Sequence, residues 1–224
     1  MSTSAMRPPL AGEVMTKLRQ DVANGRWAVG QRIPAEPELI AELGVSRGTL
    51  REAIKALAHS GIFEVRRGDG TYVRATSEIC GTAQRVYREH SDHDVLQVRF
   101  ALDTQAARLA ARASDQNVTE RLRDLLDQRS DAWQRQDFSA WSQADWAFHL
   151  EVARASGVPL LHELYESFGD VFHGTKMSQR LAEGFDGCLR EGHEALVEAI
   201  EAADDEAAAR TVIANLDYCM GWMP

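Results

Sequence analysis

The chain has 224 residues, of which 44% are hydrophobic and 26% charged, enough for two soluble domains with cores of their own. No apolar run approaches the ~18–20 residues of a membrane helix and the start has no signal-peptide pattern, so we expect neither a membrane protein nor a secreted one. The three cysteines, Cys80, Cys188 and Cys219, form no CxxC pair and no disulfide framework, which favours the cytoplasm.

The formal charge of −9 is unevenly distributed along the chain. Residues 1–75 carry 11 Lys and Arg against 8 Asp and Glu, a net +3, whereas residues 76–224 carry 14 against 26, a net −12. A basic module joined to an acidic body is typical of a DNA-facing domain attached to one that phosphate repels. We therefore expect a DNA-binding domain over 1–75 and a second domain over 76–224.

Residues 1–75 predict three helices and a β-hairpin. Apolar residues at helical spacing predict a helix over about 12–24, a short one after Pro34 that ends near Leu43, and a third that begins after Ser46 and stops at Gly61. Two strand-like runs, 62–65 and 71–74, flank an Asp-Gly pair that predicts a hairpin turn. This order is that of a winged helix-turn-helix.

Beyond Ala75 the strand pattern disappears. Helical patterns follow at about 78–90, 93–113, 116–135, 138–155, 158–173, 187–202 and 204–220. Short links between successive helices predict an antiparallel bundle. The expected fold class is therefore mainly α: an N-terminal winged helix-turn-helix, with three helices and a β-hairpin wing, followed by an all-α antiparallel helical bundle.

The start of the third helix carries side chains suited to DNA. Ser46, Arg47, Thr49 and Arg51 lie within six residues. Arginine can bond a guanine edge through two donors or pair with phosphate, and hydroxyl groups can serve either target. Arg67 and the neighbouring glycines would let the wing backbone approach the duplex. The alternative is a winged helix used for protein contacts, in which these arginines would be surplus.

Three runs of residues closely resemble the GntR family of bacterial regulators. They are Gly30-Gln-Arg-Ile-Pro-Ala-Glu-Pro-Glu-Leu39, Leu43-Gly-Val-Ser-Arg-Gly-Thr-Leu-Arg-Glu-Ala53 and Gly68-Asp-Gly-Thr-Tyr-Val73, and the match covers nearly all of 10–74. The resemblance implies that Arg47 and Arg51 contact DNA, with Ser46, Thr49 and the wing glycine Gly70 assisting. In place of the arginine that the family often has two residues before Leu39, this chain has Pro37. Arg32 is the candidate to compensate by touching phosphate.

Asp145 and His149 form a possible metal site in the second domain. They are four residues apart in a predicted helix, so they share a face and could hold one ion together with His193, which begins another predicted helix. The spacing alone does not decide the matter, because a carboxylate four residues before a histidine is more often a surface pair.

Residues 93–220 resemble the all-helical ligand domain of the FadR subfamily, called FCD. The matching elements are Val98-Arg-Phe-Ala-Leu-Asp103, the Asp145 to His149 segment, Ala155-Ser-Gly157 and Gly192-His193. In metal-binding members, an aspartate and three histidines hold a divalent ion beneath a carboxylate effector. The resemblance implies that Asp145, His149 and His193 hold zinc, nickel or a similar ion.

The fourth histidine of that set falls near Asn215 in this chain. A neutral amide oxygen is a poorer ligand for such ions than imidazole. Two alternatives follow: a metal held by three side chains plus water or effector, or a metal-free pocket in which Asn215 hydrogen-bonds the effector directly. Arg99, on the first long bundle helix, is expected either to clamp an effector carboxylate or to form a buried pair with Asp103 or Asp145.

The sequence thus predicts a transcriptional regulator, by default a repressor, that acts as a homodimer on a pseudo-palindromic operator. A small organic or sugar acid would be its effector, and no catalytic residues are assigned. Two rival hypotheses remain. One is a hydrolytic enzyme that uses Asp145, His149 and His193 as a metal centre. The other is an architectural DNA-binding protein whose bundle only dimerises.

Overall fold

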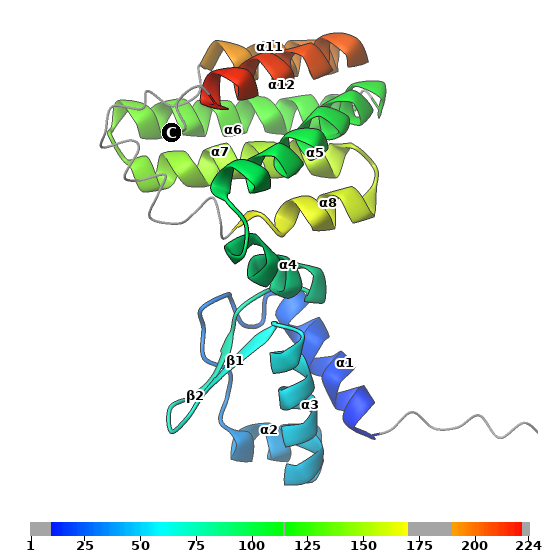
Figure 1. The fold of residues 1–224 in the computed structure, drawn as a ribbon, viewed down its shortest axis with the longest axis vertical. Coiled ribbons are helices and arrows are strands. Elements are labelled where there is room, and N and C mark those ends of the chain that lie inside the picture. Colours follow the sequence, from blue (N-terminus) through cyan, green and yellow to red (C-terminus); the bar gives the residue numbers. More distant parts are fainter. Residues whose placement is uncertain (1–9, 114, 170–189, 221–224) are drawn as a thin grey trace, which may run out of the picture. The chain divides into compact units, whose positions relative to one another are not determined.

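The computed structural model describes residues 10–113, 115–169 and 190–220 (Figure 1). The chain divides into two units between Arg85 and Val86, within helix α4 (Glu78–Arg88), and each unit is described by itself. The domain boundary after residue 75 stays a prediction. Among the described residues, the helices are too short or too polar to cross a membrane.

The first unit is a winged helix-turn-helix. Its elements are α1 (Leu10–Ala23), α2 (Glu36–Leu43), α3 (Arg47–His59), β1 (Phe63–Arg66) and β2 (Gly70–Val73). The two strands pair antiparallel with Phe63 opposite Val73, and Arg32 adds an isolated bridge to Tyr72. The predicted fold class of this unit is confirmed.

Local sequence explains where α2 and α3 meet. Gly44 ends α2 in the left-handed conformation at φ 64°, which glycine adopts without steric cost. Ser46 caps α3 as predicted, because its side chain accepts a hydrogen bond from the backbone N–H of Thr49 at 3.1 Å. The core below this turn contains the fully buried Leu18, Leu39, Leu50 and Leu57.

The hairpin forms as expected, although its turn lies earlier than the Asp69-Gly70 pair suggests. Gly70 already pairs with Arg66, and the loop between them is Arg67-Gly68-Asp69. Gly68 takes the left-handed conformation at φ 76°, and the N–H of Asp69 donates to the carbonyl of Arg66 at 3.1 Å. A three-residue loop that contains a left-handed glycine is a common way to close a hairpin.

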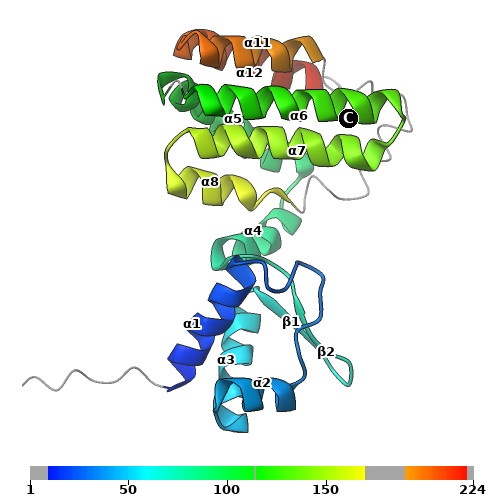
Figure 2. The same ribbon diagram turned by 180° about the vertical axis from the view of Figure 1, so that it is seen from behind.

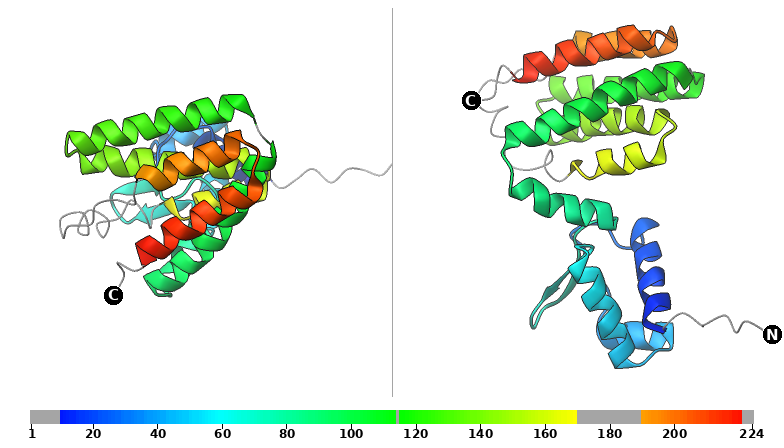
Figure 3. Two further views of the ribbon diagram at one scale, coloured as in Figure 1. Left: turned by 90° about the horizontal axis from the view of Figure 1, so that it is seen from above. Right: turned by 45° about the vertical axis from the view of Figure 1, so that its right-hand side comes forward.

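The second unit is a helical bundle. Its helices are α5 (Asp92–Ala113), α6 (Gln116–Gln134), α7 (Phe138–Ala155), α8 (Pro159–Glu166), α11 (Arg190–Glu201) and α12 (Asp205–Met220). Helices α6 and α7 pack side by side, and α8 lies against α7 (Figure 2). Helix α12 lies along α5 and is paired with α11 (Figure 3). The largest side chains of the core include Phe148, Tyr165, Leu122 and Ile200.

Helix α8 is shorter than the predicted helix over 158–173. It ends at Glu166, where the hydroxyl of Ser167 donates to the carbonyl of Leu164. A serine side chain that bonds the preceding turn competes with the helical hydrogen bonds and favours an end to the helix. His173, for which the sequence favours an ordinary role over one in lining the bundle cavity, lies outside the described residues.

We expect Gly61→Ala to destabilise the first unit strongly. Gly61 has φ +83°, and a Cβ there would lie 2.7 Å from the carbonyl oxygen of Gly81, so strain and a backbone clash add. The expected loss is about 3 kcal/mol or more in the free energy of unfolding, measured by urea denaturation at fixed protein concentration. Gly25→Ala is the control, since Gly25 has φ +75° but open space around its Cβ, and should cost only about 1 kcal/mol. Equal losses would contradict this account of Gly61.

Candidate functional site

The start of α3 presents the predicted DNA-contacting side chains at the surface. The hydroxyls of Ser46 and Thr49 lie 2.9 Å apart and bond each other, which fixes both at the first turn. Arg47 is exposed beside them, and within the described part of the chain no acidic group pairs with it. The free N–H groups of this helix start add to its attraction for anions.

Arg51, one turn further along α3, is held by an acidic partner that the sequence did not suggest. Its Nε donates to both carboxylate oxygens of Glu36, at 3.0 and 2.9 Å. Glu36 is the first residue of α2, so the pair links the two helices of the helix-turn-helix. Sequence reasoning missed it because the two residues lie 15 positions apart on different helices, where no periodicity relates them.

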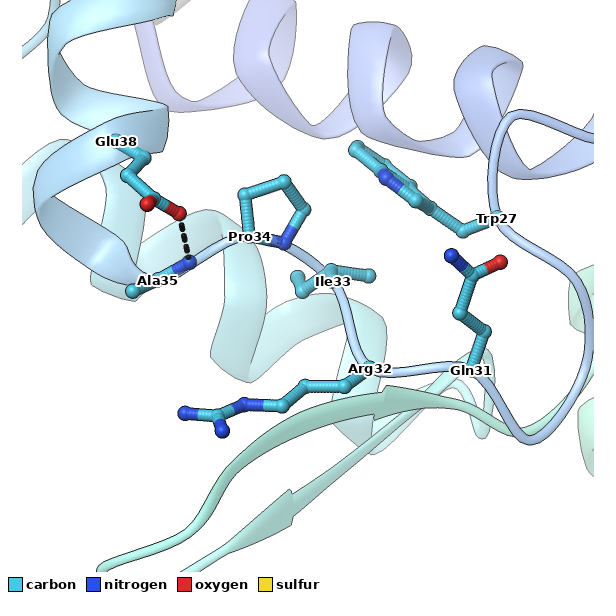
Figure 4. A pocket seen from close by; sticks show the side chains of 7 residues that line it. All are labelled: Trp27, Gln31, Arg32, Ile33, Pro34, Ala35 and Glu38. Atoms are coloured by element: carbon cyan, nitrogen blue, oxygen red, sulfur yellow. Dashed lines mark hydrogen bonds between the residues drawn. The ribbon is translucent and has the colours of Figure 1, made fainter.

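Arg32 lies against the wing. Its backbone bridges to Tyr72, and its guanidinium group lies so close to Gly70 that a Cβ there would displace the Arg32 side chain from this position. In the close view the Arg32 side chain extends along the wing and away from Trp27 and Gln31 (Figure 4). The hollow of about 440 Å³ seen there is lined by Trp27, Gln31, Arg32, Ile33, Pro34, Ala35 and Glu38.

The two arginines of the wing differ in whether their charge already has a partner within the protein. Arg66 donates to Glu64 at 3.1 Å and lies 4.0 Å over the ring of Tyr72, so its charge is already engaged. Arg67 is exposed, and no ion pair holds it among the described residues. A second hollow, of about 270 Å³, is lined by Arg32, Glu36 and the wing segment 65–71. The start of α2 and the wing therefore share one surface.

In the bundle, the structure brings the three expected metal ligands together. Asp145 and His149 come from α7 and His193 from α11, and one ligand atom of each lies within 4.8 Å of the others. His193 Nε2 is 3.3 Å from His149 Nε2 and 3.5 Å from Asp145 Oδ1. His193 is buried, whereas the side chains of His149 and Asp145 are 20% and 21% exposed.

Arg129 of α6 holds the carboxylate of Asp145 in place. Its Nε donates to Asp145 Oδ1 at 2.7 Å, and its guanidinium lies 4.9 Å over the ring of the buried Trp141. Burial alone would raise the pKa of Asp145, but the hydrogen bond from His193 and the charge of Arg129 outweigh it and lower that pKa below its ordinary value. The carboxylate is therefore ionised, as a metal ligand must be.

A series of polar side chains, mostly buried and in contact with one another, leads from Tyr165 to His149 of the cluster. Arg99 Nε donates to the hydroxyl of Tyr165 at 2.9 Å and lies 3.1 Å from Asp103 Oδ2. The other oxygen of Asp103 is 3.6 Å from Nδ1 of His149. Burial lowers the pKa of His149, and the charge of Arg99 lowers it further, which favours the neutral imidazole that metals bind. Of the two partners considered for Arg99, the structure selects Asp103.

Asn215 approaches this cluster from α12. It is half-buried, and its side-chain amide occupies the space that a Cβ on Gly192 would fill, directly before His193 in the chain. The absence of a side chain at position 192 is what admits the amide. The contact of Asn215 with an effector stays a prediction.

The donor set fits a divalent ion of the zinc type. One carboxylate and two neutral imidazoles are three of the ligands that such ions take, and they leave a position open for water or an effector. In the same bundle, Trp146 stacks on Tyr165 with ring centroids 5.3 Å apart, and Trp141 is buried. His162, on α8, is not part of the cluster.

Comparison with protein families covers both units. Residues 10–73 match the model described as bacterial regulatory proteins of the gntR family, and residues 94–218 match the FCD domain. Several curated relatives match over most of their length. An Escherichia coli (strain K12) protein whose name assigns it to regulation of the L-lactate dehydrogenase operon is 29% identical over 93% of this chain and 84% of its own. The HTH-type transcriptional regulator LutR of Bacillus subtilis is 28% identical over 87% of this chain and 92% of its own. The Uxu operon regulator of Haemophilus influenzae is 27% identical, with 89% and 76% covered.

Solved structures share the fold. The GntR protein of Streptococcus agalactiae superposes with a TM-score of 0.56 at 24% identity and covers 93% of this chain and 98% of its own. The McbR/YncC protein of E. coli gives a TM-score of 0.54 at 21% identity, with 96% and 97% covered.

Proposed function

The chain belongs to the GntR family of bacterial regulators and carries an FCD domain, so it is a DNA-binding transcriptional regulator, and we propose that a small carboxylate bound in its bundle controls its affinity for DNA. The relatives are named as regulators rather than as enzymes, which argues against the hypothesis that Asp145, His149 and His193 form a hydrolytic metal centre. The FCD domain is the effector-binding part of such regulators.

One observation supports the carboxylate most directly. Arg99, Asp103 and His149 form a continuous polar chain inside the bundle that ends at His193 and Asp145. An arginine that pairs with an internal carboxylate can exchange it for that of a ligand, and an ion held by the cluster can bind the same ligand through its open position. The E. coli relative named for the L-lactate dehydrogenase operon makes a small 2-hydroxy acid the first candidate.

We further propose how the first unit contacts DNA. The contacting residues would be Arg32, Ser46, Arg47, Thr49, Arg51, Arg67 and Gly70. A homodimer would place one winged domain on each half-site of a pseudo-palindromic operator in the cytoplasm. The effector would bind more tightly to the form that is released from DNA, which makes the protein a repressor.

A titration with carboxylates tests the effector proposal. The operator is first selected by the wild-type protein from a library of randomised duplexes, and its affinity is then measured by fluorescence anisotropy. We expect L-lactate or a sugar acid in the tested panel to weaken operator binding roughly tenfold, the size of a typical coupling between sites. The matching amide, such as L-lactamide, serves as the control and should have no effect. A carboxylate that binds the protein in calorimetry without changing operator affinity would contradict the proposal.

A further inference from the structure

Two glutamates begin helix α2, and they have different local roles. Glu38 accepts a hydrogen bond from the backbone N–H of Ala35 at 2.9 Å and so completes the start of the helix. Glu36 makes no such bond: within the described residues, the hydrogen bonds to its two carboxylate oxygens come from Arg51 Nε. The arginine that the family often has at position 37 is replaced by Pro37, so this turn carries no cation of its own.

Stability does not explain the Glu36–Arg51 pair. Its side chains are 35% and 58% exposed, and ion pairs at that exposure contribute little to folding. A carboxylate at this position also repels the phosphates of the duplex that the surface is to bind. A negative charge at the start of α2 interacts favourably with the helix dipole, which would be reason enough for a glutamate at position 36. It would not explain why both carboxylate oxygens of Glu36 accept from Nε of Arg51.

The geometry leaves the terminal nitrogens of Arg51 available. Only Nε is engaged by Glu36, and in the described part of the chain Nη1 and Nη2 have no partner. These two groups can donate to O6 and N7 of guanine, the commonest base-specific contact of arginine. A guanidinium that is already held in place loses less rotamer freedom on binding than a free one does.

We propose that Glu36 is a positioning residue that holds Arg51 for the recognition of a guanine in the major groove, an inference that rests on the DNA interface proposed above. Without Glu36, Arg51 can turn to the nearest phosphate instead, so the protein binds all DNA better and discriminates less between sequences. Arg47 has no acidic partner among the described residues. Unlike Arg51, it can therefore pair with a phosphate group of the duplex.

The test compares the DNA affinity of Glu36→Gln with that of the matched variant Glu38→Gln. Three kinds of duplex are used: the selected operator, operators in which each guanine in turn is replaced by adenine, and a scrambled duplex. Glu38→Gln removes the same charge from the same turn and keeps the helix start, because glutamine can accept the bond from Ala35. We expect the penalty for replacing one guanine per half-site to fall about tenfold in Glu36→Gln and to stay unchanged in Glu38→Gln. Binding to the scrambled duplex should rise a few-fold in both.

Two further variants separate positioning from a role in the helix. Glu36→Asp keeps the negative charge at the helix start but shortens the side chain by one methylene, so it should lose discrimination as Glu36→Gln does. In an Arg51→Ala background, Glu36→Gln should leave discrimination at that guanine unchanged. Discrimination that survives in both Glu36 variants would overturn the proposal. If the wild-type protein selects no sequence at all, the DNA interface itself fails.

Discussion

Replacing Arg51 by alanine is expected to weaken binding to the selected operator roughly 1000-fold. A bidentate contact from arginine to guanine is worth about 2 kcal/mol, and a dimer loses it at both half-sites, so about 4 kcal/mol disappears. Binding to a scrambled duplex should change by less than about threefold, because no phosphate contact is removed. Fluorescence anisotropy on the two duplexes measures both quantities.

Arg47→Ala is the matched comparison on the same helix turn. If Arg47 takes phosphate, its loss weakens binding to both duplexes by the same factor and lowers the slope of log affinity against log salt by about one per half-site. Arg51→Ala should leave that slope almost unchanged. A uniform loss of affinity in Arg51→Ala, with the preference for guanine kept, would show that Arg51 is a phosphate contact instead.

The order of the elements could be predicted because each one carries its own local signals. Ser46 marks the start of α3, because its side chain accepts a hydrogen bond from the backbone N–H of Thr49. Gly44 ends α2, because a residue in the left-handed conformation is needed there. The end of α8 shows the limit of such signals. The helical pattern continues past Glu166, but a bond from the side chain of Ser167 competes with it.

The partners within the candidate sites could be predicted only in part. The sequence indicated that Asp145, His149 and His193 belong together, but it left Asp103 and Asp145 open as partners of Arg99. The structure decides between them because Arg129, from another helix, already holds Asp145. The contacts of Arg129 depend on how α6 packs on α7, which no spacing within α6 reveals.

Loss of the carboxylate from the metal cluster is the second large effect that we expect. Untagged protein purified without chelator should contain about one zinc, nickel or similar ion per chain by elemental analysis, and Asp145→Ala should contain little. Because Asp145→Ala also removes the carboxylate that accepts from the buried Arg129, Asp145→Asn is measured beside it. The asparagine keeps an acceptor for Arg129 but lacks the charged ligand. His162→Ala, outside the cluster, should keep its ion. A wild-type protein that takes up no metal even when incubated with zinc or nickel would direct the search to effectors held by Arg99 and hydrogen bonds alone.

Asn215→His extends the same prediction in the opposite direction. An imidazole is a far better ligand for zinc or nickel than an amide oxygen, and the side chain of residue 215 already reaches the backbone of Gly192, directly before His193. We expect the variant to bind zinc roughly tenfold more tightly in competition with a chelating dye, since a fourth protein ligand replaces water. Ile213→His is the control, because it adds a histidine to α12 at a position that is 39% exposed. The same affinity in both variants would place Asn215 outside the reach of the ion. A tighter site in Asn215→His alone would mean that the wild-type protein keeps an open coordination position, which an effector carboxylate can occupy.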